Sequence, residues 1–86
     1  MPEISRFYGI IIMINFDDHN PPHFHVRYNQ DKAIIDIKTG GLLAGSLPPR
    51  ALGLVVEWAR LHKDELLADW QLAIAHKPLN KIKPLE

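Results

Sequence analysis

The stretch HFHVRYNQDKAIIDI, residues 23–37, decides the fold. Residues 23–28 alternate between polar and apolar side chains, which is the period-two pattern of a half-buried β-strand. The polar residues 29–31 follow as a turn, and residues 32–37 read as a further strand. The connection is short enough for the two strands to pair as an antiparallel hairpin. On the first of these strands the core face carries Phe24, Val26 and Tyr28, and the opposite face carries His23, His25 and Arg27.

The segments on either side of the hairpin predict more strands. Residues 7–15 form a β-branched run without helical spacing, broken by Gly9, which we interpret as one strand buried on both faces. Residues 17–22 predict a turn, because Asx side chains bond nearby backbone and proline fixes φ. Residues 42–47 predict a brief fourth strand that ends at Pro48.

From Pro49 onward, apolar residues recur at helical spacing. This pattern predicts a helix over residues 50–62 and a second helix over residues 63–75, separated by a bend or a tight turn. Trp58 and Trp70 lie on or beside the apolar stripes and are predicted to anchor the core. The expected fold class is therefore α+β, with three to four short, mainly antiparallel strands followed by two C-terminal helices packed on the sheet.

The length of 86 residues predicts a single domain over residues 1–86, and a composition of 47% apolar and 23% charged residues is that of a folded globular chain. A core of this size supplies little net stability, so a partner chain or a homodimer could add to it. The lack of cysteine excludes disulfides and thiolate metal sites. Ten basic and ten acidic residues cancel, so no global field attracts nucleic acid. No secretory signal or membrane span is evident, and we expect a cytoplasmic protein with no membrane partner.

Histidine is the residue type whose distribution stands out. Three of the five histidines, His19, His23 and His25, fall within seven positions and adjoin Asp18. His23 and His25 are one residue apart on a predicted strand, so both rings project from one face. Three interpretations stay open: a solvated strand face with a capped turn, a proton-transfer or RNA-contacting site, and a metal site closed by His19 or an aspartate. The spacing permits a metal without requiring one, so no metal ligand and no cofactor is assigned.

Arg27 shares the predicted face of His23 and His25, which puts a fixed positive charge beside two imidazole rings. Such a face could bind a phosphate. Histidine as acid or base, with arginine stabilising developing charge, is sufficient for metal-independent RNA cleavage, in which the ribose 2′-hydroxyl is the nucleophile. The alternative is an ion pair between Arg27 and an acid on a neighbouring strand. The lysines of residues 77–83 are interpreted as a solvated, basic C-terminus.

Three segments together resemble a known family: MPEISRFYGIII at residues 1–12, DHNPPHFHV at residues 18–26 and LPPRAL at residues 47–52. They look like the small bacterial proteins grouped as domain of unknown function 4160, and the likeness covers nearly the whole chain. The resemblance implies a gene that lies beside that of a second small protein, in what looks like a toxin–antitoxin operon with this family as the toxin. The signature residues of the family that this chain carries are Asp18, His19, Asn20, His23 and His25.

Two functions from different classes follow. The first is a bacterial toxin, an endoribonuclease or another inhibitor of translation, which acts on RNA and is neutralised by a small antitoxin-like partner encoded nearby. The second is a non-catalytic binding or regulatory module, with or without a metal, that acts with a small partner protein. The candidate catalytic residues are His23, His25 and Arg27, and the candidate binding residues are Asp18, His19 and Asn20. Growth arrest on expression without the neighbouring gene distinguishes the two functions.

Overall fold

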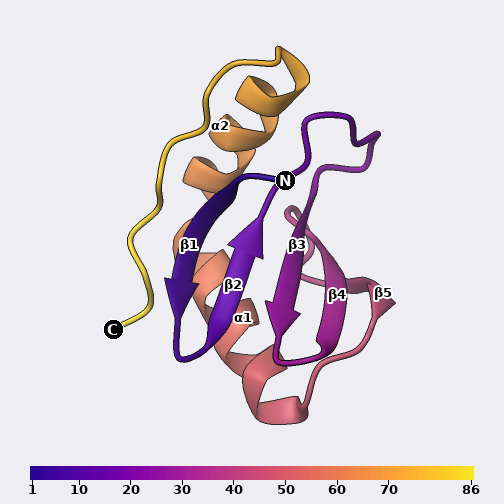
Figure 1. Ribbon diagram of the computed structural model, residues 1–86, viewed down its shortest axis with the longest axis vertical. Coiled ribbons are helices and arrows are strands. Elements are labelled where there is room, and N and C mark those ends of the chain that lie inside the picture. Colours follow the sequence, from indigo (N-terminus) through magenta and orange to yellow (C-terminus); the bar gives the residue numbers. More distant parts are fainter.

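A computed structural model describes the whole chain, residues 1–86. Five strands are followed by two helices (Figure 1). Their bounds are β1 (Glu3–Phe7), β2 (Ile10–Met13), β3 (His23–Tyr28), β4 (Asp31–Asp36), β5 (Leu42–Gly45), α1 (Pro49–Leu61) and α2 (Lys63–Ile74). Each strand pairs antiparallel with the next along the chain, so the sheet order is β1-β2-β3-β4-β5. The α+β class and the two C-terminal helices are confirmed, whereas the expected three to four strands are too few.

The extra strand arises from a reversal of the chain at Tyr8 and Gly9. Both residues have positive φ, 51° and 80°, and Phe7 pairs directly with Ile10. This is the kind of two-residue hairpin turn whose twist matches that of the flanking strands, and it usually carries Asn-Gly. The prediction of one strand over residues 7–15 is therefore wrong, because a tyrosine in a left-handed conformation conceals the turn.

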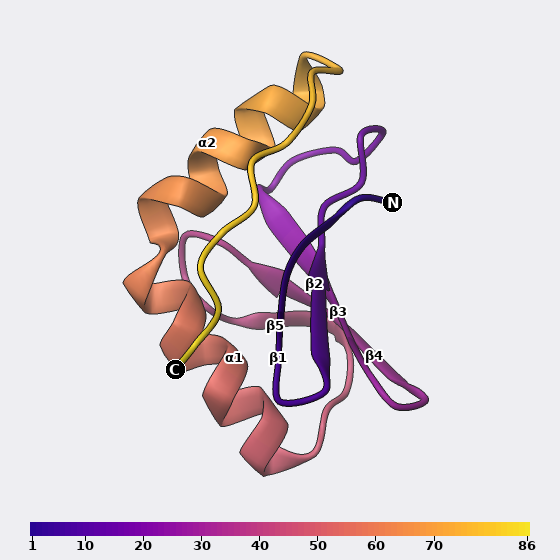
Figure 2. The same cartoon turned by 60° about the vertical axis from the view of Figure 1, so that its left-hand side comes forward.

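The two helices cover the same face of the sheet, and no helix lies on the other face (Figure 2). We call the uncovered side the open face. In β2, Ile10 and Ile12 are fully buried, while Ile11 and Met13 alternate with them and are partly exposed on the open face. The prediction that this run is buried on both faces is therefore wrong.

The hydrophobic core lies between the covered face of the sheet and the two helices. Trp58 in α1 and Trp70 in α2 are 0% and 1% exposed, which confirms their predicted role as anchors. The Trp58 ring packs against Phe7 and Phe24, with ring centroids 5.4 Å and 6.0 Å apart. These contacts join α1 to β1 and β3, so one aromatic residue ties together the helix layer and the sheet.

Both helices begin and end within one residue of their predicted bounds. Pro49 stands in the first turn of α1, where its missing N–H would have had no partner in the helix. At His62 the backbone leaves helical geometry, with φ −119° and ψ 27°, and the chain turns tightly into α2. Neither helix is long and apolar enough to cross a membrane.

The C-terminal segment, residues 77–86, runs beside β1 and packs on the domain (Figure 1). Ile82 is 4% exposed, and its N–H donates to the carbonyl of Ile4 at 2.8 Å. The indole Nε1–H of Trp58 donates to the carbonyl of Lys83 at 2.9 Å. The prediction of a merely solvated C-terminus is wrong, because these contacts bind the segment to the first strand and to the core.

Asp69 in α2 holds the same segment and makes stability depend on pH. The residue is 1% exposed; one carboxylate oxygen accepts the N–H of Asn80 at 2.9 Å, and the other has no partner. Burial raises the pKa of this carboxyl above its ordinary value of 3.8, the Asn80 N–H opposes the shift, and the charge of Glu65 adds to it. A raised pKa in the folded state means that ionisation destabilises the fold, so stability is lost as the pH rises through the raised pKa.

Asp69→Asn is therefore expected to melt at a higher temperature than the wild type at neutral pH. Asparagine keeps an oxygen for the Asn80 N–H and cannot ionise. The difference in Tm should shrink as the pH falls towards the ordinary carboxyl pKa of 3.8. Thermal unfolding followed by circular dichroism, from neutral pH down to this value, measures the difference in Tm. Asp64→Asn, at an exposed position of the same helix, is the matched control. A difference in Tm that is the same at every pH would contradict the assignment.

Gly45 at the end of β5 and Gly53 in α1 should respond to alanine with opposite signs. Gly45 has a φ of +76°, and a Cβ there would overlap the carbonyl oxygen of Lys32. Gly45→Ala should therefore lower the free energy of unfolding by roughly 2 kcal/mol or more. Gly53 is exposed, with no atom within 4 Å of an added Cβ, so Gly53→Ala should raise it by about 0.5–1 kcal/mol. Urea unfolding measures the change in the free energy of unfolding for both variants. A Gly45→Ala protein as stable as the wild type would show that the backbone at residue 45 is not constrained.

Candidate functional site

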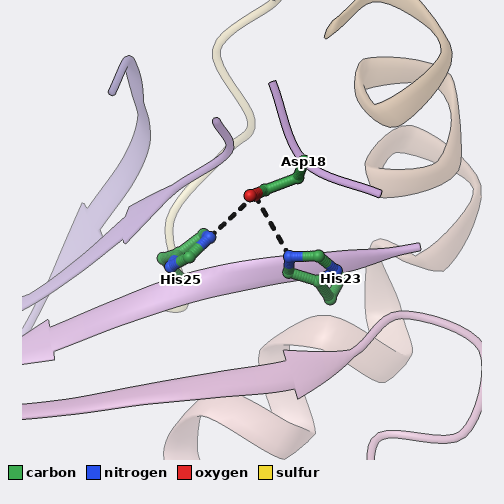
Figure 3. A group of neighbouring side chains, drawn as sticks. All are labelled: Asp18, His23 and His25. Carbon is green, nitrogen blue, oxygen red and sulfur yellow. Dashed lines mark hydrogen bonds and ion pairs between the residues drawn. The ribbon is translucent and has the colours of Figure 1, made fainter. Parts of the chain in front are cut away.

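Three side chains meet at the N-terminal end of β3, where the loop between β2 and β3 returns over the sheet (Figure 3). His23 and His25 come from β3 and point the same way, because residues two apart in a strand share a face. Asp18 comes from the loop and points at both rings. We call these three residues the histidine cluster.

One carboxylate oxygen joins the two histidines. Asp18 Oδ2 lies 2.8 Å from His25 Nε2 and 3.1 Å from His23 Nε2. The centroids of the two imidazole rings are 5.3 Å apart. The side chains of Asp18, His23 and His25 are 17%, 11% and 19% exposed, so the contacts are partly shielded from water. Shielding makes each contact stronger than a fully exposed ion pair would be.

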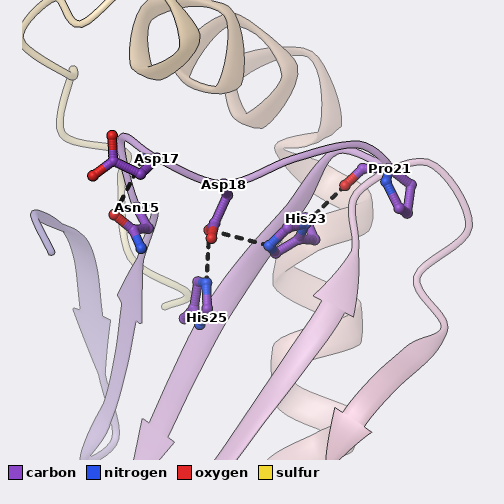
Figure 4. Close-up of polar contacts among 6 residues, drawn as sticks. All are labelled: Asn15, Asp17, Asp18, Pro21, His23 and His25. Atoms are coloured by element: carbon purple, nitrogen blue, oxygen red, sulfur yellow. Dashed lines mark hydrogen bonds and ion pairs between the residues drawn. The ribbon is translucent and has the colours of Figure 1, made fainter.

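His23 is held from two sides. Its Nδ1 lies 2.7 Å from the carbonyl oxygen of Pro21 (Figure 4), and its ring packs on Trp70 with centroids 5.1 Å apart. A carbonyl oxygen only accepts hydrogen bonds, so Nδ1 must carry the hydrogen. In a neutral ring, Nε2 then carries no hydrogen, and its lone pair is directed towards the Asp18 carboxylate. The 3.1 Å contact therefore needs a positive charge between the two atoms, either a proton on Nε2 or a bound cation.

His25 has more freedom than His23. Its Nε2 pairs with Asp18, while its Nδ1 forms no hydrogen bond within the protein. The ring also borders a hollow of ≈ 450 Å³ on the open face, whose other walls include the apolar residues Met1, Met13, Ile34 and Ala44. A molecule bound in this hollow can therefore reach one member of the histidine cluster.

Two cationic residues border the same hollow. Arg27 is exposed and lies directly opposite Lys32 across the pairing of β3 with β4. Neither forms an ion pair, so the alternative in which Arg27 pairs with an acid on a neighbouring strand is wrong. Like charges that face each other across two strands repel. A bound anion would relieve this repulsion.

His19 and Asn20 lie outside the cluster. Both residues are exposed in the loop, and neither side chain forms a hydrogen bond. Elsewhere in the loop, the Asp17 N–H donates to the side-chain oxygen of Asn15 at 3.3 Å (Figure 4). Of the residues predicted to bind, only Asp18 reaches the two histidines.

Three groups at the site were missed by sequence reasoning. Lys32 was missed because the predicted turn over residues 29–31 would put it opposite Tyr28. The observed two-residue turn, residues 29–30, puts it opposite Arg27 instead. The carbonyl of Pro21 and the ring of Trp70 had no sequence signal, since their contacts with His23 depend on how the loop and α2 pack. Trp70 was assigned to the core, where it does lie, but its contact with a polar residue of the site has no sequence pattern.

Comparisons with known proteins gave one match. A family model described as "Domain of unknown function (DUF4160)" matches residues 9–71. The matched region contains the histidine cluster together with Arg27 and Lys32, and it begins after β1. Searches of curated proteins and of solved structures found no match.

Proposed function

We propose that this chain, which belongs to the DUF4160 family, is the toxin of a bacterial toxin–antitoxin pair and acts on RNA at the open face of its sheet. The family description names no activity, so support comes from the geometry of the site and from the resemblance of the signature residues. One observation carries the proposal: His25, Arg27 and Lys32 border a single hollow.

The two kinds of residue at the hollow suit the two requirements of phosphodiester chemistry. Arg27 and Lys32 offer positive charge to a phosphate, and a guanidinium can bind two of its oxygens at once. His25, which is hydrogen-bonded to Asp18, can act as a general acid or base. Because the net charge of the chain is zero, RNA binding would depend on this local charge. A toxin that blocks translation without cleavage would use the same two cations.

A second candidate, a non-catalytic binding module, is favoured by the apolar walls of the same hollow. The helices do not cover the apolar part of this surface, which consists of Met1, Met13, Ile34 and Ala44. Uncovered apolar surface rimmed by polar groups is typical of protein interaction sites. In this function the small partner protein is the ligand, and the cationic residues contribute to its recognition.

Expression of the full chain in bacteria, with and without the protein encoded beside it, tests the proposal. We expect growth arrest when the chain is expressed alone and growth when both are present. Mapping of new RNA ends in arrested cells separates cleavage from inhibition without cleavage. If no level of expression arrests growth, the toxin role is wrong, and binding of the neighbouring protein then supports the second candidate.

A further inference from the structure

We propose that the histidine cluster is a binding site for one divalent transition-metal ion, with zinc as the best fit, held by Asp18 Oδ2, His23 Nε2 and His25 Nε2. The inference deepens the proposed function, because it gives the same site a cofactor. Binding of the ion does not depend on that function; only its role in RNA chemistry rests on it.

The three ligand atoms already converge. They lie within 4.8 Å of one another, and the carboxylate oxygen is 2.8 Å and 3.1 Å from the two nitrogens (Figure 3). Ligands bound tetrahedrally to zinc at about 2.0–2.1 Å are about 3.3 Å apart. Both oxygen–nitrogen distances are therefore within about half an ångström of the value expected with a zinc ion bound.

The hydrogen bond of His23 selects the tautomer that a metal needs. Its Nδ1–H is fixed by the Pro21 carbonyl at 2.7 Å, which leaves the lone pair of Nε2 directed into the cluster. Histidines that bind metals usually donate their other ring N–H to a carbonyl or a carboxylate in this way. A cation placed between Nε2 and Asp18 replaces an unfavourable contact between a lone pair and a carboxylate with two favourable ones. His25 can adopt the same tautomer, because its Nδ1 has no competing partner.

The donor set indicates which ion fits. Two imidazole nitrogens and one carboxylate oxygen suit zinc and similar divalent metals, whereas calcium and magnesium prefer oxygen ligands. Three protein ligands also leave a coordination position open, as in catalytic zinc sites. His25 borders the hollow that Arg27 and Lys32 flank, so the ion would lie next to a hollow in which these cations can hold a phosphate.

Zinc titration of the untagged, full-length protein after dialysis against a chelator tests the site. Calorimetry should give one zinc per chain, and the Tm of the wild type should rise in its presence, because the ion binds the folded state. Asp18→Asn and His25→Ala should each weaken zinc binding by more than about 100-fold. Their Tm values without zinc show that the variants are folded.

Two further variants sharpen the test. His62→Gln removes a histidine whose ring pairs with Glu65 and packs on Trp58, outside the histidine cluster, so zinc binding should be unchanged. If the wild type binds no stoichiometric zinc, or if Asp18→Asn and His25→Ala bind as the wild type does, the site is wrong. Loss of binding in His19→Ala with retention in His25→Ala would also overturn it, because His19 lies outside the cluster.

Failure of the metal site and failure of the toxin role give different results. If the protein arrests growth and binds no zinc, the toxin role stands and the metal site is wrong. If the protein binds one zinc and never arrests growth, the metal site stands and the toxin role is wrong. RNA cleavage by the purified protein that persists unchanged in excess chelator assigns the chemistry to histidine without metal and overturns the role of the ion in that reaction.

Discussion

Bacteria that express His25→Ala without the neighbouring protein are expected to grow, whereas the wild type arrests them. A histidine that takes part in the chemistry contributes about 10²–10⁴-fold in rate, and its loss should bring toxicity below the level that stops growth. The effect on stability should be about 1–2 kcal/mol, because the side chain lies outside the hydrophobic core and its removal breaks one hydrogen bond, that with Asp18. Growth curves and the Tm of the purified variant measure the two effects separately.

Asp18→Asn is the companion variant, since it keeps the size of the side chain and removes the charge to which both rings are directed. We expect it to relieve arrest as His25→Ala does. His23→Ala is a weaker test, because its ring packs on Trp70 and its loss should lower stability as well. If His25→Ala and Asp18→Asn are folded and fully toxic, the histidine cluster is not the active site, and Arg27 and Lys32 become the next candidates.

Much of the fold could be predicted from local patterns. Alternation over residues 23–28 and the short turn after it identify the β3–β4 hairpin, and 3.6-residue spacing identifies both helices to within one residue. The reversal at Tyr8 could not be predicted, because tyrosine is an unusual choice for a left-handed turn position and the apolar run continues across it. The bound C-terminal segment was also missed, since its hydrogen bonds use backbone groups that carry no sequence signal and its buried Ile82 stands between two lysines.

The site divides in the same way. Strand alternation was enough to put His23, His25 and Arg27 on one face. The position of Asp18 above the rings, and the exclusion of its neighbour His19, follow from the path of a loop, for which periodicity gives no information. The shared carboxylate of the histidine cluster therefore depends on tertiary structure and could not be predicted from the strand pattern.

Trp58→Ala is expected to have the largest effect on stability, a loss of about 3–5 kcal/mol in the free energy of unfolding. Trp58 is 0% exposed and packs against Phe7 and Phe24, so truncation leaves a cavity between α1 and the sheet. It also removes the donor to the carbonyl of Lys83, which should loosen the C-terminal segment. Native domains have only about 5–15 kcal/mol in total, so this single substitution removes a large part of the stability.

Two variants in the same helix separate the causes of this loss. Trp58→Phe keeps an aromatic ring in the core and removes the indole N–H, and it should cost about 1–3 kcal/mol. Leu61→Ala removes a side chain of a residue that is 64% exposed, and it should change stability by about 0.5 kcal/mol or less. Urea unfolding followed by circular dichroism gives the three values, and limited proteolysis reports release of residues 77–86. A Trp58→Ala protein that loses less than Leu61→Ala would mean that α1 is held to the sheet by other contacts.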